Sequence, residues 1–403
     1  MCSEYIPIYQ QMNKIVILDP SCTGDSNSHH MNALIGHART FIAAGYHVIL
    51  GTNAICRVDY PGTENNPVFN YTIYDDFSSN TIRFYKRLIK KPYYYSKVIN
   101  TSKAIEFVFQ NNLIDDTDHV FIPTLDWILL QSLVKIYESQ NRVPFLHLLI
   151  MFEKSKWMTG GYPYKKIIKI LRNFNQDRIF IYTETRRHAK NLEKILGVLP
   201  ANYPYPAFAF DNQNLSIKPE DKIYVGALGG GRKDKGYGLL PDIIKKFNET
   251  YSSHDNVIFP VQRARMEDQL EAQDRLLEDI KNVMILDNHL ARQDYEKYLL
   301  SCDMAIFPYF SSVYATRGSG IVNEAVANGI PVICTAGSAL TEVILCNNGK
   351  AASNIDEFAQ SIIDIINNLN LYKTNAENAK IIFMENLCNN QVIKNIKLLT
   401  IKK

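Results

Sequence analysis

The 403-residue chain is too long for one ordinary hydrophobic core, so its length predicts two domains of roughly 200 residues each. Apolar residues make up 46% of the chain and charged residues 21%, which excludes a disordered protein, and no apolar run approaches the roughly 20 residues of a membrane-spanning helix. The formal net charge of +3 is too small for a dedicated nucleic-acid-binding protein. Seven scattered cysteines without a CxxC pair, and an N-terminus without a secretory-signal pattern, lead us to expect a cytoplasmic protein with neither a disulfide framework nor a zinc site.

The first half begins with the pattern of a parallel α/β fold. Lys14–Asp19 predicts a buried strand, the apolar residues between Met31 and Ile42 have helical spacing, and Tyr46–Leu50 predicts a second strand. Gly45 suits the end of that helix. A strand–helix–strand unit of this kind is parallel and right-handed. The next elements expected are strands at His119–Pro123, Phe145–Phe152 and Arg178–Tyr182, and a helix at Arg186–Leu196.

A proline-rich stretch, Leu199–Pro206, and the polar stretch Asp211–Asp221 predict an interdomain linker. The alternation of strands and helices then restarts, with strands expected at Ile223–Leu228, Val257–Val261, Val283–Leu286, Met304–Pro308 and Pro331–Thr335. Apolar strands alternating with amphipathic helices predict an α/β fold with two doubly wound, Rossmann-like domains.

The loop after the first strand of the second half, Gly226–Gly236, combines three successive glycines with Arg232, Lys233 and Lys235. Glycines let the backbone approach a ligand closely, and cations with a helix expected from about Tyr237 suit a diphosphate. No GK[ST] ends the loop, so it is not a Walker A motif. A surface loop with solvated charges remains the alternative.

A second segment, Tyr314–Ile333, predicts a loop, an N-cap at Ser319 and a helix over about Gly320–Asn328. The first backbone N–H groups of such a helix point beyond the carboxyl edge of the sheet, where doubly wound folds bind nucleotides. Glu324, one turn into the helix, is placed to accept both hydroxyls of a ribose. The alternative is an ordinary first-turn glutamate favoured by the helix dipole.

The histidines allow two interpretations. His147 lies in an apolar strand pattern and is either a core residue or a residue of the interdomain cleft. His29 and His30 follow the loop after the first strand, flanked by Asp19 and Asp25, and we expect them to line that cleft. We expect no metal here, because His29, His30 and His37 have no carboxylate or cysteine at ligand spacing.

These segments resemble the donor domain of retaining GT-B glycosyltransferases, the glycosyltransferase family 4. The resemblance covers most of residues 222–345 and rests on Gly226 with Lys235-Gly236, on Leu290–Leu299, on Phe307–Tyr309 and on Ser319–Val332. The first half is similar only loosely, through the Gly24 loop, Ala43–Val48 and Tyr203–Pro206. The resemblance implies an acceptor-binding domain over residues 1–205, a nucleotide-sugar domain over 206–384, a central cleft, and a C-terminal helix at 385–403 that packs back on the first domain.

The resemblance also implies roles. Lys235 would contact the donor diphosphate, Glu324 the ribose, and the backbone near Asn288 the base. Apart from the resemblance, His147 is a candidate for a cleft residue near the acceptor hydroxyl. Lys235, Glu324 and His147 are the catalytic candidates. Thr316 stands where similar enzymes often carry a second glutamate, and Arg232 is a substitute for an arginine expected earlier in the glycine loop. The candidate donor-binding residues are Gly24, Gly229, Gly230, Arg232, Lys235, Asn288, His289, Leu290, Thr316, Arg317, Ser319, Gly320, Ile321 and Glu324, and the acceptor or cleft candidates are His29 and His30.

The implied activity is transfer of a sugar from a nucleoside diphosphate sugar to a glycan or lipid-linked acceptor, with retention and without a metal or other cofactor, in surface polysaccharide or glycolipid assembly. Two alternatives remain, a nucleotide-sugar epimerase and a silent nucleotide-sugar-binding subunit. Arg83–Lys103 and Lys154–Arg172 are basic and rich in aromatic residues. They predict either peripheral contact with the anionic inner face of the cell membrane or a solvated basic surface. No nucleic-acid partner is expected.

Overall fold

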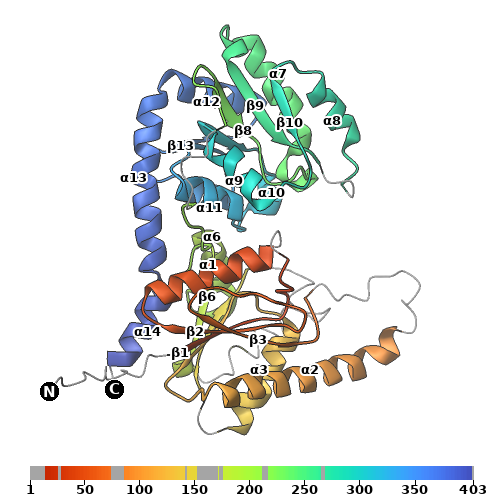
Figure 1. Cartoon of the computed structure of the whole chain (residues 1–403), viewed down its shortest axis with the longest axis vertical. Coiled ribbons are helices and arrows are strands. Elements are labelled where there is room, and N and C mark those ends of the chain that lie inside the picture. Colours follow the sequence, from red (N-terminus) through yellow and green to blue (C-terminus); the bar gives the residue numbers. More distant parts are fainter. Residues whose placement is uncertain are drawn as a thin grey trace, which may run out of the picture. The chain divides into compact units, whose positions relative to one another are not determined.

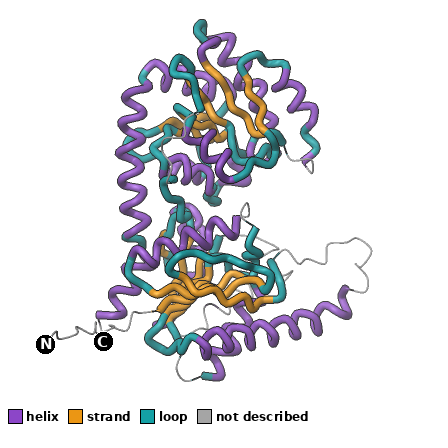
Figure 2. The backbone as a smooth tube through the Cα atoms, viewed as in Figure 1, coloured by secondary structure: helices purple, strands orange, loops and turns teal. Residues whose placement is uncertain are grey.

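The computed structural model describes residues 14–25, 29–73, 86–140, 143–151, 171, 176–210, 217–264 and 268–401. The chain divides into two compact units. Unit 1 comprises Met1–Thr183, Leu192–Tyr203 and Asn390–Lys403, and unit 2 comprises Glu184–Asn191 and Pro204–Asn389. Each unit contains one sheet of parallel strands with helices packed on it (Figure 1; Figure 2).

The sheet of unit 1 has the strand order β3-β2-β1-β4-β5-β6-β7. Its strands are β1 (Lys14–Asp19), β2 (His47–Asn53), β3 (Thr63–Phe69), β4 (His119–Ile122), β5 (Phe145–Leu149), β6 (Ile179–Thr183) and β7 (Ala201–Asn202). Its helices are α1 (His29–Ala43), α2 (Lys86–Asn111), α3 (Trp127–Ser139), α14 (Gln391–Ile401) and the end of α6 (Arg186–Leu196), with a short 3₁₀ turn at Gln176–Arg178.

Alternation along β1 explains why helices cover both faces of this sheet. Val16 and Leu18 belong to a core cluster with residues of α2 and α3, whereas Ile15 and Ile17 belong to one with α1 and α14. All four side chains are completely buried. Successive side chains of a strand point to opposite faces, so a continuous apolar run requires cover on both sides.

The sheet of unit 2 has the order β10-β9-β8-β11-β12-β13. Its strands are β8 (Ile223–Gly226), β9 (Val257–Gln262), β10 (Val283–Leu286), β11 (Met304–Phe307), β12 (Val332–Thr335) and β13 (Gly349–Ala352). Its helices are α7 (Leu240–Thr250), α8 (Glu271–Glu278), α9 (Arg292–Leu300), α10 (Ser311–Tyr314), α11 (Gly320–Ala327), α12 (Ile355–Asn367) and α13 (Leu369–Cys388), and its 3₁₀ turns are Lys233–Lys235, Tyr237–Leu239, His254–Asn256 and Ala339–Val343.

In unit 2 the strand order reverses between β8 and β11, which both start near the middle of the sheet. The chain runs outward from β8 to β9 and β10, then returns to β11 on the other side and continues to β12 and β13. Loops that leave neighbouring strands in opposite directions open a crevice at the carboxyl edge, and this is where such sheets bind ligands. The loops after β8 and β11 contain both segments singled out in the sequence.

The prediction of two doubly wound α/β units is confirmed. The helix expected from about Tyr237 is present, but its first turn, Tyr237–Leu239, is 3₁₀, and α7 follows from Leu240 with Pro241 in its first turn. No helix among the described residues has both the length and the apolar character to cross a bilayer. Of the two basic segments, residues 83–85, the side chains of 86–94 and almost all of 154–172 lie outside the described part of the chain.

Candidate functional site

The glycine loop of unit 2 has a backbone that only glycine adopts easily. Gly229 and Gly230 have φ of 105° and 70°. Their N–H groups both donate to Oε1 of Gln262, at 2.8 and 2.6 Å. Gln262 is the last residue of β9 and is buried, and its side-chain amide donates to the carbonyl oxygen of Asn288, 3.2 Å away, in the loop after β10. Gln262 therefore joins the loops that follow β8 and β10.

Lys235 is held over this loop. Its ammonium donates to the carbonyl oxygen of Gly229 and lies 5.7 Å from the centre of the Tyr309 ring. The next residue, Gly236, has a φ of 68°, and a Cβ at this position would overlap the carbonyl oxygen of Pro308. Close backbone packing and a left-handed conformation thus explain the Lys-Gly pair of the sequence.

The start of α11 lies against the same loop. Ser319 is the N-cap, with an extended backbone and no side-chain capping bond. A Cβ on Gly229 would come 2.8 Å from Ile321 and 3.3 Å from the Lys235 ammonium, so the glycine loop, the lysine and the helix start are in mutual contact. A helix start with a nearby ammonium is a favourable place for an anion.

Two arginines contact Tyr314, one through its hydroxyl and the other through its ring. The Arg232 guanidinium donates to the tyrosine hydroxyl at 3.1 Å and forms a two-pronged ion pair with Asp234 at 2.8 and 3.0 Å. The Arg317 guanidinium lies 5.4 Å from the centre of the same ring. Thr316 presents its carbonyl oxygen to the Thr185 hydroxyl, 2.5 Å away. The positive charges of Arg232 and Arg317 are therefore held next to Tyr314, and Arg232 is also paired with Asp234.

Glu324 is held by two donors from α9. One carboxylate oxygen accepts from Arg292 at 3.0 Å and the other from the Tyr295 hydroxyl at 2.5 Å. Arg292 also bonds Glu296 at 2.7 Å and stacks on Phe210, 5.0 Å from its ring centre. The Glu324 side chain is 12% exposed. Each carboxylate oxygen keeps further acceptor capacity, so the carboxylate is both oriented and able to take a ligand hydroxyl.

The remaining donor-site candidates of unit 2 lie at the carboxyl end of β10. Asn288 and Leu290 are partly buried, and His289 is exposed. Only the Asn288 carbonyl is tied to the glycine loop, through Gln262. The structure thus brings together the candidates of the glycine loop and of α11, and connects the loop after β10 to them through one residue, Gln262, that the sequence analysis missed.

The comparisons with known proteins follow the same division of the chain. The sequence model of the family described as glycosyl transferases group 1 matches residues 209–381, which lie in unit 2. No curated protein matches the chain by sequence.

The fold is similar to that of solved structures along nearly the whole chain. A glycosyltransferase from Rickettsia africae is 12% identical with a TM-score of 0.65, covering 97% of this chain and 99% of its own. Sucrose-phosphate synthase from Thermosynechococcus elongatus is 12% identical with a TM-score of 0.62, covering 97% and 98%. Anabaena Alr3699/HepE in complex with UDP-glucose is 14% identical with a TM-score of 0.57, covering 97% and 100%.

The chain has the GT-B fold and contains a glycosyl transferases group 1 domain over residues 209–381. Its fold is the one expected from the resemblance.

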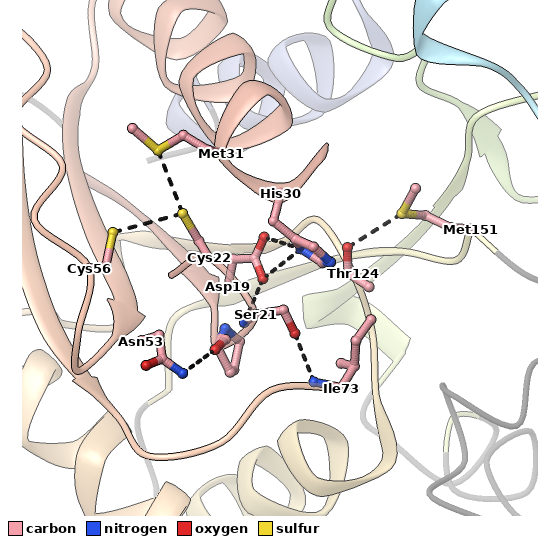
Figure 3. A network of polar contacts seen from close by, with 11 residues as sticks. Asp19, Ser21, Cys22, His30, Met31, Asn53, Cys56, Ile73, Thr124 and Met151 are labelled. Carbon is pink, nitrogen blue, oxygen red and sulfur yellow. Dashed lines mark hydrogen bonds and ion pairs between the residues drawn. The ribbon is translucent and has the colours of Figure 1, made fainter. Parts of the chain in front are cut away.

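The carboxyl edge of unit 1 is a network of paired polar side chains (Figure 3). Asp19, at the end of β1, lies 2.9 Å from Nδ1 of His30 on α1 and accepts the Ser21 N–H at 3.0 Å. Asn53, at the end of β2, donates to the Pro20 carbonyl oxygen at 3.0 Å. The Cys22 sulfur lies 3.9 Å from that of Cys56. His30 and Asp19 are both buried, so their contact lies inside the protein at this edge.

The carboxylate of Asp19 changes the pKa of His30. Burial lowers the pKa of His30, but the neighbouring carboxylate outweighs burial and the pKa is raised above its ordinary value. The side chain of His29 lies outside the described part of the chain. Gly24, a donor-site candidate, belongs to unit 1, has a φ of 88° and packs against the backbone of Cys56 and Arg57.

The catalytic candidate His147 is wrong. It lies on β5, has no exposed surface, and its two ring nitrogens contact Nδ1 of His119 at 3.1 Å and the Tyr182 hydroxyl at 2.9 Å. Burial, followed by the proximity of His119, lowers its pKa well below the ordinary value. A neutral histidine with both nitrogens bonded inside the core has no access to a substrate.

The sequence contains one Asp-x-Asp triplet, Asp116–Asp118, a pattern that can bind a metal–diphosphate. It lies directly before β4, at the amino edge of the sheet of unit 1. Asp118 is buried and accepts the N–H groups of Lys14 at 3.2 Å and Asp115 at 3.0 Å. Its carboxylate ties the starts of two strands together and lies at the edge opposite to the one where such folds bind ligands.

Proposed function

We propose that this chain takes a sugar from a nucleoside diphosphate sugar and passes it to a glycan or lipid-linked acceptor in surface polysaccharide or glycolipid assembly. The observation that carries the proposal is the mutual contact of the Gly229 loop, the Lys235 ammonium and the start of α11 at the switch point of the unit 2 sheet. The complex of Anabaena Alr3699/HepE with UDP-glucose supports a donor of this class.

Each end of the donor has a proposed partner in unit 2. The diphosphate lies at the N–H groups of Ser319, Gly320 and Ile321 and near Lys235, since both attract negative charge. The ribose hydroxyls bond to Glu324, which Arg292 and Tyr295 hold in a single orientation. The base lies along the backbone after β10, at residues 288–290.

The reaction proceeds with retention, and the leaving phosphate itself assists the acceptor hydroxyl. No metal is required, because Lys235 and the start of α11 stabilise the charge that develops on the leaving diphosphate. The test of this part is direct: full activity after dialysis against EDTA agrees with it, and activity restored only by added Mg²⁺ or Mn²⁺ contradicts it.

The decisive experiment is incubation of the chain with a panel of UDP-, GDP- and dTDP-sugars without acceptor. Slow release of free sugar supports the transferase, because water then replaces the acceptor. Conversion of the donor into its epimer identifies an isomerase instead. Binding without either reaction indicates a silent subunit, and no binding of any nucleotide contradicts the proposed donor site.

The acceptor side is proposed to work at an anionic membrane, through the basic and aromatic segment Arg83–Lys103. Lysine and arginine near a membrane surface each contribute about 1 kcal/mol of attraction, and high salt screens it. Binding to liposomes should therefore rise with the anionic lipid fraction and disappear when Lys86, Arg87, Lys90 and Lys91 are all replaced by Ser, with nucleotide affinity unchanged. No binding at low salt indicates a soluble acceptor.

A further inference from the structure

Three carboxylates lie on α11 or near the segment Tyr314–Gly318 that leads into it. Glu324 lies one turn into α11 and is held by Arg292, whereas Asp234 lies in the glycine loop and is paired with Arg232. The third, Glu184, directly follows β6, more than a hundred residues earlier in the chain, and nevertheless belongs to unit 2. Neither the sequence patterns nor the proposed donor contacts account for Glu184.

The segment that carries Glu184 is anchored at several points within unit 2. The Thr185 hydroxyl donates to the carbonyl oxygen of Thr316 at 2.5 Å. The carboxylate of Glu342 accepts the N–H groups of Arg186 at 2.7 Å and Arg187 at 2.9 Å, at the start of α6. A glutamate that caps two helix N–H groups fixes the position of the turn before that helix. Glu184 is therefore held next to the loop that leads into α11.

Gly318 provides the room for this carboxylate. It does not have a positive φ, so its backbone conformation does not call for glycine. A Cβ at this position would lie only 3.2 Å from Oε2 of Glu184 and 3.7 Å from Cγ2 of Thr185. The Glu184 carboxylate thus lies directly against the turn Thr316–Gly318, one residue before the N-cap Ser319.

Tyr205 connects Glu184 to the rest of the site. A Cβ on Gly320 would lie 3.1 Å from the Tyr205 ring, which places the ring at the start of α11. Burial, then the charges of Glu324 and Glu184, raise the pKa of the Tyr205 hydroxyl, so both carboxylates act on the same group. Burial also raises the pKa of Glu184 to about 7, against the opposing charge of Arg317. A desolvated carboxyl group beside a ligand site is typical of a functional residue.

We propose that Glu184 binds the donor sugar, accepting hydrogen bonds from hydroxyls of the sugar that is transferred. The inference rests on the proposed function. A diphosphate at the start of α11 with its ribose at Glu324, inside the helix, carries its sugar toward the residues that precede the helix. Those residues are Thr316–Gly318, and Thr316 has no carboxylate to offer there. Glu184 supplies one from a separate element.

The test compares a nucleoside diphosphate with its nucleotide sugar. The chain and its variants Glu184→Gln and Glu184→Ala are titrated calorimetrically with UDP and UDP-glucose, or with the GDP–mannose or dTDP–glucose pair if the donor panel selects one of those. Release of free sugar from the same donor is measured alongside. Glu193→Gln is the matched control, since Glu193 is an exposed residue of α6, the helix that follows Glu184.

Both variants should bind the nucleoside diphosphate as the unmodified chain does, while affinity for the nucleotide sugar and the rate of sugar release fall about ten- to a hundred-fold, the usual effect of removing hydrogen bonds to a charged group. Glu193→Gln should change neither ligand. Equal loss for both ligands would show that Glu184 only shapes the start of α11, and no loss in Glu184→Gln would overturn the proposal. If Glu184→Ala does not fold, the nearly isosteric Glu184→Gln decides. If the unmodified chain binds no nucleotide, the proposed function itself fails.

Discussion

The two sheets have a similar strand order, but their carboxyl edges are made of different chemical groups. In unit 2 the edge is made of backbone and cations, with Gly229 and Gly230 in the left-handed region and Lys235 over the loop. In unit 1 the edge is made of buried polar side chains that bond to one another or to the backbone, Asp19 to His30 and Asn53 to the Pro20 carbonyl oxygen. The comparison shows that the same edge of this fold can be built from backbone conformation and cations or from buried polar side chains.

The two solutions differ in how they respond to change. A backbone site depends on the absence of side chains, so it fails when a methyl group is added. A side-chain site depends on paired polar groups, so it fails when one partner is removed or changes its charge. Substitutions in one unit therefore have matched counterparts in the other.

The largest effect is expected from Gly236→Ala. The left-handed conformation costs about 1–2 kcal/mol for a non-glycine residue, and overlap with the Pro308 carbonyl oxygen adds about 1–3 kcal/mol. Gly45→Ala in unit 1 is the control, because its φ is 87° but its Cβ would meet open space, so only the conformational cost applies. Urea denaturation of both variants measures the difference. Equal losses of stability would mean that close packing at Gly236 is unimportant.

His147→Ala tests whether unit 1 uses this residue for its core. We expect the free energy of unfolding to fall by about 2–5 kcal/mol, because a cavity opens and the bonds to His119 and Tyr182 are lost. The exposed His289→Ala should change it by less than about 0.5 kcal/mol. A stable His147→Ala protein with impaired transfer would show that His147 takes part in the reaction after all.

Lys235→Ala and Glu324→Ala are expected to weaken nucleotide binding by about 1.5–3 kcal/mol each, roughly ten- to a hundred-fold, as charge-assisted hydrogen bonds are lost. Both side chains are partly exposed, so the melting temperature should change little. Lys233→Ala, an exposed lysine of the same turn, serves as the control and should bind normally. Calorimetry with nucleoside diphosphates is the measurement, and unchanged affinity in both variants would place the donor site elsewhere.

The smallest effect concerns pH, and it should have opposite signs for two histidines of unit 1. The pKa of His30 is raised, so its contribution to stability is complete below about pH 6.5 and is lost as pH rises through the folded-state pKa. The pKa of His147 is lowered, so its contribution is present above about pH 6.5 and declines below it.

Thermal melts of the unmodified chain, His30→Gln and His147→Gln between pH 5 and 8 measure this difference. The stability lost in His30→Gln should shrink with rising pH, and that lost in His147→Gln should grow. Parallel curves for the two variants would show that Asp19 does not hold a proton on His30.

Much of the fold was predictable because its strands are buried on both faces. The bounds of β1, α6 and β10 are those expected from the apolar runs. The edge strand β3, Thr63–Phe69, was missed because it is polar and contains a proline, which an edge position tolerates. The short β13, Gly349–Ala352, has too little apolar character to predict a strand. Strands are therefore predicted correctly from the sequence where burial on both faces requires a continuous run of apolar residues.

The site divides in the same way. Lys235, Gly229 and Ser319 could be proposed as site residues from the sequence because conformation and charge leave a local signature. Gln262, Arg292, Tyr295 and Glu184 could not be proposed in this way, because each contacts the candidate site through a partner far along the chain. One local signal was present: Gln262 ends a buried strand and Glu184 follows one, and polar residues at the carboxyl ends of parallel strands gather at the ligand edge.

The division of the chain has a consequence for the order in which the protein can fold. The last helix, α14, places Val392, Ile393 and Ile396 in the core of unit 1 beside Ile15 and Ile17 of β1. Unit 2, Pro204–Asn389, is therefore synthesised in full before unit 1 is complete, although unit 1 begins first. On the ribosome the apolar surface meant for α14 stays uncovered while unit 2 emerges. Loss of the final helix would thus damage the domain that begins the chain and spare the one that precedes the break.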